Sequence, residues 1–104
     1  MDDRTLERSL QTIGKACFAR YFELFVDRRL DAATVARRIL ESEAYAATAT
    51  RRRVSAARRI IDCNRGIDAL ENVAASNNVD DAARQKAHAL LDAGFPTQGL
   101  MSQS

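Results

Sequence analysis

The scarcity of turn-forming residues constrains the fold of this chain more than any other feature. Only four glycines and one proline occur in 104 residues, and no closely spaced turn signal precedes Asn64. Alanine and arginine dominate the sequence, whereas valine and isoleucine are few. Because alanine and arginine favour helices and β-branched residues favour strands, the composition predicts an all-α fold rather than a sheet.

The length of the chain indicates one domain. A chain of 104 residues has room for a single hydrophobic core. Apolar residues make up 46% and charged residues 29% of the sequence, which is ordinary for a folded domain. We therefore expect a small bundle of four to five helices in residues 1–95. Residues 96–104 are mostly small and polar, and we expect them to form a disordered tail.

Apolar residues recur at helical spacing in the first part of the chain. The stripe that begins at Leu6 predicts one long helix from residue 2 or 3 to about residue 28. Gly14 has a low helix propensity, which indicates a bend within this helix. The helix is expected to lie at the centre of the core, because its second half carries four of the six aromatic residues. They are Phe18, Tyr21, Phe22 and Phe25.

A second helix is predicted after Asp31, whose carboxylate suits the N-cap position. The stretch that follows lacks glycine and proline, so one helix could run unbroken over residues 32–62. Alternatively, the chain turns near residues 45–47, and Thr48 or Thr50 caps a new helix. We favour the turn, because a short single domain must fold back to bury both apolar stripes.

Glycine and proline mark the ends of the later helices. Gly66 is predicted to adopt the left-handed conformation that ends the basic helix before it. A short helix through Ile67 and Leu70 follows, and the last helix opens at Asp80. Gly94 is predicted to end this last helix, because the nearby Pro96 prevents its continuation.

The charge of the chain is small in total and uneven in distribution. The formal net charge is +2. Residues 30–65 contain eight arginines against four acidic residues, whereas residues 66–104 contain two basic residues against five acidic ones. A basic middle and an acidic end favour a polyanionic partner or head-to-tail self-association.

Residues 51–61 combine the helical pattern with the basic charge. Val54, Ala57 and Ile60 fall on one side of a helix, and arginines lie on the other side. Such a helix can anchor itself in a core while it presents guanidinium groups to phosphate or carboxylate. The residues expected to bind a partner or nucleic acid are Arg51, Arg52, Ser55, Arg58, Arg59 and Arg65.

Two functional hypotheses follow from these features. The first is a non-enzymatic binding or regulatory module that acts through protein–protein interaction or self-association. It is supported by the aromatic cluster, which offers more apolar area than the alanine-rich helices comfortably cover, and aromatic residues are enriched at interfaces. The expected dimer interface consists of Phe18, Tyr21, Phe22 and Phe25.

The alternative hypothesis is a nucleic-acid-binding protein that uses the arginine-rich helix over residues 51–65. This helix and the preceding one would form a helix-turn-helix-like pair, with arginine and serine available for phosphate and base contacts. Two features oppose this interpretation. Asp62 lies within the arginine face, and the separation between Leu40 and Val54 exceeds the usual short turn.

The sequence does not favour an enzyme, and we expect no cofactor and no metal. His88 is the only histidine, and no ligand or nucleophile accompanies it at a fixed helical offset. Cys17 and Cys63 are isolated from each other and from a second ligand. No apolar segment is long enough to span a bilayer, and no apolar signal core follows Met1. We therefore expect a cytoplasmic protein with free thiols and no membrane association.

Overall fold

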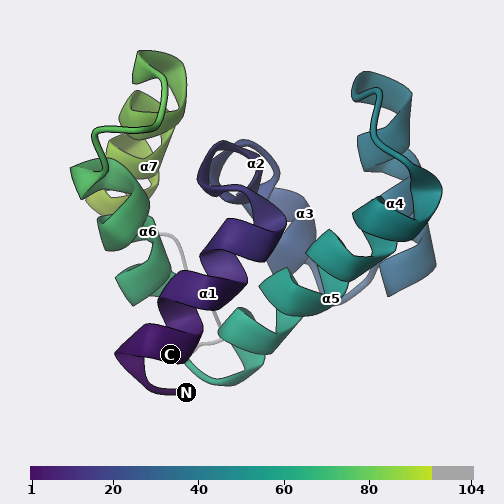
Figure 1. The fold of residues 1–104 in the computed structure, drawn as a ribbon, viewed down its shortest axis with the longest axis horizontal. Helices are drawn as coiled ribbons and strands as arrows, with labels where there is room; N and C mark the ends of the chain where they lie inside the picture. Colours follow the sequence, from purple (N-terminus) through teal and green to yellow (C-terminus); the bar gives the residue numbers. More distant parts are fainter. Residues whose placement is uncertain (95–104) are drawn as a thin grey trace.

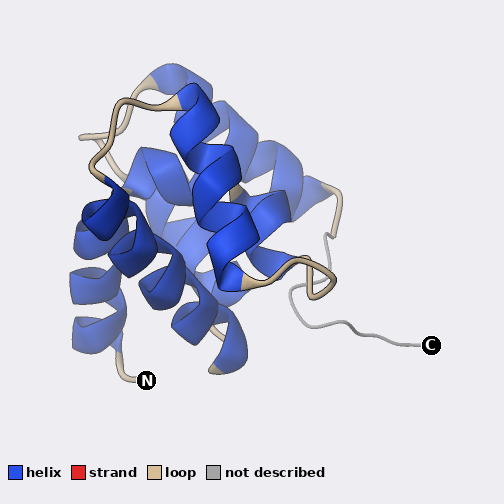
Figure 2. Cartoon of the chain, turned by 90° about the vertical axis from the view of Figure 1, so that its right-hand side faces the viewer, coloured by secondary structure: helices blue, strands red, loops and turns tan. Residues whose placement is uncertain are grey.

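The computed structural model describes residues 1–94. The predicted tail over residues 96–104 lies outside this part, as does the predicted role of Pro96. The described residues are helical and contain no strand (Figure 2). They form seven helices instead of the four to five predicted. These are α1 (Asp3–Ile13), α2 (Lys15–Arg20), α3 (Phe22–Val26), α4 (Ala32–Ser42), α5 (Ala47–Asp62), α6 (Gly66–Ala75) and α7 (Asp81–Asp92).

The prediction of one long N-terminal helix is wrong, because the chain breaks at Gly14, where a bend was predicted, and again at Tyr21. A straight helix over residues 3–28 would measure about 39 Å. The longest extent of the molecule is only 35 Å. The two breaks let α1, α2 and α3 turn around the core instead of projecting beyond it. They account for the additional helices.

Gly14 is required by its backbone conformation and by a close neighbour. Its φ is +88°, which residues with a Cβ rarely adopt. A Cβ at this position would also lie 3.0 Å from Nη1 of Arg53. That guanidinium donates a hydrogen bond to the carbonyl oxygen of Ile13, the last residue of α1. The glycine therefore permits a residue of α5 to satisfy the end of α1.

The predicted turn after the second amphipathic stripe is confirmed, and residues 32–62 form two helices. The connection between α4 and α5 consists of residues 43–46. The predicted threonine caps are wrong, because Ala46 occupies the N-cap position and no side chain bonds there. Thr50 is instead buried within α5, and its hydroxyl donates to the carbonyl oxygen of Ala46 at 3.0 Å.

The α4–α5 connection is attached to the end of α2 through Glu43. Oε2 of Glu43 accepts hydrogen bonds from the Tyr21 hydroxyl at 2.6 Å and from Nη1 of Arg20 at 2.6 Å. The bond from Tyr21, followed by the bond from Arg20, lowers the pKa of the Glu43 carboxyl below its ordinary value. These contacts fix the start of α5 relative to the N-terminal helices.

The ends of the helices in the later part of the chain agree with the predictions in part. Asp31 caps α4 as predicted, with its carboxylate accepting from the Thr34 amide at 2.8 Å. Gly94 has a φ of +64° just after α7, as predicted. The prediction for Gly66 is wrong, because this buried residue begins α6. Asn64 adopts the left-handed conformation instead, with a φ of +64°, and asparagine tolerates this region better than most residues.

The core lies where the N-terminal helices meet α5, α6 and α7. Helix α1 packs against α5, and α6 and α7 form a hairpin beside them, while α4 covers the opposite side of α5 (Figure 1). At the centre, the rings of Phe18, Phe22 and Phe25 have no exposed area. Phe18 lies edge-on to Phe22, with 5.5 Å between the ring centroids. The polar faces of α1 and α5 are left at the surface beside each other.

Candidate anion-binding groove

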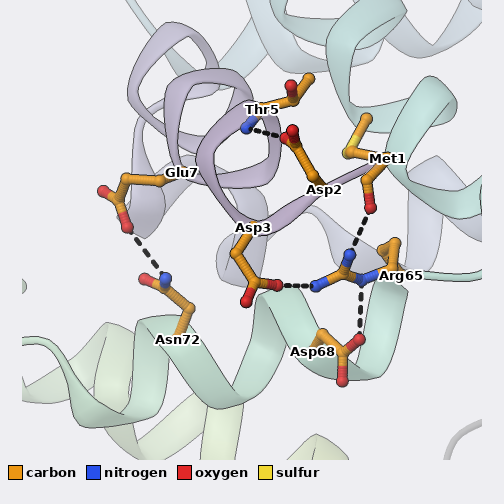
Figure 3. Close-up of polar contacts among 8 residues, drawn as sticks. All are labelled: Met1, Asp2, Asp3, Thr5, Glu7, Arg65, Asp68 and Asn72. Carbon is orange, nitrogen blue, oxygen red and sulfur yellow. Dashed lines mark hydrogen bonds and ion pairs between the residues drawn. The ribbon is translucent and has the colours of Figure 1, made fainter.

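Helices α1 and α5 run in opposite directions and are joined at both ends by arginines. At one end, Arg53 binds the carbonyl oxygen of Ile13, as described above. At the other end, Arg65 donates to the carbonyl oxygen of Met1 and, at 2.5 Å, to Oδ1 of Asp3 (Figure 3). These bonds hold the surface between the two helices in a fixed arrangement.

A groove of about 560 Å³ lies between the outward faces of these helices, and we call it the α1–α5 groove. Among residues 1–94, its charged side chains are four arginines, and no carboxylate lines it. One arginine comes from α1 and three come from α5. Guanidinium groups gathered in a concave surface attract anions and offer them planar pairs of donors. The arginines are Arg8, Arg51, Arg52 and Arg59.

Hydroxyl side chains complete the lining of the α1–α5 groove. Five of them stand among the arginines, and Ala56 is the one apolar residue of the lining. Hydroxyls donate to phosphate oxygens and add short-range contacts to the long-range attraction of the guanidiniums. The hydroxyl residues are Thr5, Ser9, Thr12, Thr48 and Ser55.

The helical periodicity explains why these side chains share one surface. On α1, Leu6, Leu10 and Ile13 are buried, which leaves the opposite, polar face of the helix outside. On α5, Val54 and Ala57 are buried in the same way. Packing the two apolar faces against the core therefore places the polar faces side by side. The groove is a consequence of two amphipathic helices lying antiparallel.

The groove arginines differ from five other arginines of the protein, which form ion pairs with carboxylates. Within residues 1–94, the side chains of these four arginines make no ion pair with a carboxylate. In contrast, Arg20 pairs with Glu43, and Arg28 pairs with Asp62. Asp62, which was predicted to oppose binding, pairs with Arg28 and does not line the groove. The groove thus concentrates positive charge that the described residues do not neutralise.

Arg58 does not join the groove, although the sequence placed it on the same face as Arg51. Its Nη2 donates to the carbonyl oxygens of Asp27 at 3.1 Å and of Leu30 at 2.6 Å. Burial lowers the pKa of its guanidinium. The connection from α3 to α4 covers this side of α5, so Arg58 fixes that connection and is not available to a ligand.

Arg65 also lies outside the groove, because α5 ends before it at Asp62. In addition to its bonds at the N-terminus, its Nε donates to Oδ2 of Asp68 at 2.7 Å (Figure 3). The hydrogen bond to Asp3 is the main cause that raises the pKa of Arg65 above its ordinary value. Two carboxylates balance this cation, which therefore has a structural role.

The aromatic residues predicted to form a dimer interface belong to the core of a single chain. Phe18, Phe22 and Phe25 are fully buried. Tyr21 is half-buried, and its hydroxyl is bound to Glu43. Helix α2 packs against α7 and α3 packs against α5, so other helices of the same chain cover the apolar area that appeared to be in excess. A second copy could not contact the three phenylalanine rings unless the core opened.

The α1 side of the groove was not predicted from the sequence, although a signal for it was present. Thr5, Arg8, Ser9 and Thr12 follow the i, i+3, i+4, i+7 spacing of one helical face. That face carries a cation and hydroxyls without a carboxylate, which is the composition of the α5 face as well. A comparison of the two polar faces would have paired them.

Within residues 1–94, no group of three or more histidine, cysteine or acidic side chains is placed to hold a metal ion. None of the helices in this part combines the length and the apolar character that a membrane crossing requires. Comparison with protein-family models, with curated proteins and with solved structures finds no significant match to this chain. The groove itself is therefore the feature that indicates a function.

Proposed function

We propose that this protein is a non-enzymatic nucleic-acid-binding protein that holds the phosphate backbone in the α1–α5 groove. The observation that carries the proposal is the presence of four arginines without acidic partners among five hydroxyls. Arginine and hydroxyl side chains are the typical donors to phosphate oxygens in protein–nucleic acid complexes. Their arrangement on two rigid helices offers several such contacts at once.

The composition of the groove favours nucleic acid over a protein partner. Protein interfaces depend on apolar and aromatic anchors at their centre, whereas Ala56 is the only apolar residue of the described part that lines the groove. Ile67 is the one large hydrophobic residue classed as exposed within residues 1–94, and it lies outside the groove. Interfaces with nucleic acid are more polar and more positively charged than interfaces between proteins, which agrees with this surface.

The proposal is tested by the salt dependence of binding to labelled DNA, measured by fluorescence anisotropy. Four arginine–phosphate contacts predict that the logarithm of the association constant falls linearly with the logarithm of salt concentration, with a slope of about −3 to −4. Polyglutamate is the control, because it carries negative charge on carboxylates instead of phosphates. Weaker binding of polyglutamate than of DNA supports phosphate recognition.

Two results would contradict the proposed function. One is the absence of binding to both duplex and single-stranded nucleic acid at low salt, at about 50 mM. The other is equal affinity for DNA and polyglutamate, which would indicate that the groove receives an acidic segment of a protein.

A further inference from the structure

A second hollow lies on the other side of α5 from the α1–α5 groove. It has a volume of about 310 Å³ and is lined by Ala32 and Ala33 of α4 together with Arg51 and Ser55 of α5. Arg51 and Ser55 line the α1–α5 groove as well. The exposed part of α5 that carries them is therefore a ridge with a hollow on each side. Helix α1 lies on one side of α5 and α4 on the other (Figure 1). Residues of α1 complete the lining of the first hollow, and residues of α4 complete that of the second.

A helix such as α5 has the general size needed to enter the major groove of a DNA duplex. A helix with its side chains is about 10–12 Å in diameter, and the major groove of B-form DNA is about 12 Å wide. Such a groove is bordered by two phosphate backbones. Arg51 and Ser55 lie between the two hollows, so one backbone of a duplex can lie on each side of them, whereas a single strand would occupy only one hollow.

The aromatic residues in the described part of the chain do not offer a platform for unpaired bases. Proteins that bind single strands generally stack bases on exposed aromatic rings. Within residues 1–94, the three phenylalanines are buried, the hydroxyl of Tyr21 is bound to Glu43, and the ring of Tyr45 lies beneath Arg53 at 4.1 Å from the guanidinium carbon. None of these aromatic residues of the described part lines either hollow.

The connection between the two helices of this surface agrees with duplex binding. Helices α4 and α5 pack against each other and are joined by residues 43–46. A connection of three or four residues is usual in helix-turn-helix pairs, in which the second helix enters the major groove. The position of α5 within this pair is that of the second helix.

We infer that the ligand is a B-form DNA duplex that straddles α5, with one backbone in the α1–α5 groove and the other against the first turn of α4. This inference rests on the proposed function and specifies its ligand. Arg51 and Ser55 face the space between the two backbones. Double-stranded RNA fits this surface less well, because the major groove of A-form RNA is too narrow and deep to admit side chains from a helix.

A single substitution on α4 separates this inference from binding in the α1–α5 groove alone. Ala33→Glu places a carboxylate in the second hollow and leaves the α1–α5 groove unchanged. Ala82→Glu is the matched control, because Ala82 is also an exposed alanine at the second position of its helix, after an aspartate N-cap. A glutamate in the first helical turn is compatible with the helix dipole, so both variants should remain folded.

The wild-type protein and both variants are compared on labelled DNA duplex, on one of its single strands and on double-stranded RNA at the same salt concentration. The wild-type protein is expected to bind the DNA duplex about tenfold more tightly than it binds the single strand or the double-stranded RNA. Ala33→Glu is expected to weaken duplex binding by about tenfold, because its carboxylate faces phosphate, whereas Ala82→Glu changes it by less than about twofold.

Other outcomes separate the two proposals. Equal or tighter binding of the single strand, or equal effects of the two variants on duplex binding, would overturn the straddled duplex and leave phosphate binding in the α1–α5 groove intact. Absence of binding to every nucleic acid would overturn the proposed function and this inference together.

Discussion

Replacing both Arg52 and Arg59 by glutamate is expected to weaken binding to a DNA duplex by at least about a hundredfold. Both arginines are exposed, both line the α1–α5 groove, and neither forms an ion pair with a carboxylate in the described part of the chain. The double substitution removes two contacts to phosphate and brings two carboxylates close to the same phosphates. Fluorescence anisotropy at one fixed salt concentration measures the change.

The control for this experiment is the double variant Arg84→Glu with Lys86→Glu. It changes the net charge by the same amount but places the new carboxylates on α7, outside the α1–α5 groove. Circular dichroism establishes that both variants keep the helix content of the wild-type protein. If the α7 variant lost as much affinity as the groove variant, net charge rather than the groove would govern binding.

Phe18→Ala is expected to lower the free energy of unfolding by about 3–5 kcal/mol. The Phe18 ring is fully buried and contacts two other rings, edge-on to Phe22 and stacked on Phe25 at 6.0 Å. Its removal leaves a cavity where the N-terminal helices meet the rest of the molecule. Because a domain of this size is stable by only about 5–15 kcal/mol, the loss should be visible as a large shift of the urea midpoint.

Ile67→Ala is the matched control, since Ile67 is an apolar residue with 37% of its surface exposed. We expect this change to lower the free energy of unfolding by less than about 1 kcal/mol. An equal loss of unfolding free energy for the two substitutions would contradict the central place of Phe18 in the core. A wild-type unfolding midpoint that rises with protein concentration would also contradict burial within one chain, because it would indicate that folding depends on a second copy.

The fold class and several helix ends could be predicted from local patterns. Apolar spacing identified the buried faces, and Asp31 and Gly94 marked ends that depend on neighbouring residues alone. The low helix propensity of Gly14 indicated a bend there, but the break at Tyr21 could not be located, because three short helices present the same apolar spacing as one long helix. The break at Gly14 depends on Arg53, which approaches from another helix to bind the end of α1.

The candidate site was predicted only on its α5 side, for a similar reason. Arg51, Arg52, Ser55 and Arg59 reach the groove because the helical face alone directs them outward. Arg58 lies on nearly the same face, but its carbonyl partners come from a connection distant in sequence. The contribution of α1 depends on the antiparallel packing of two helices, which a single-helix pattern does not contain.

The claim that DNA binds in the α1–α5 groove is tested most directly by a ¹H–¹⁵N NMR titration of the full chain with a DNA duplex. We expect the largest changes in backbone amide shifts at the hydroxyl residues of α1 and α5, because these line the groove. Helices α6 and α7 contribute no lining residue and should change little. Shift changes confined to α6 and α7, or no change at saturating DNA, would contradict binding in this groove.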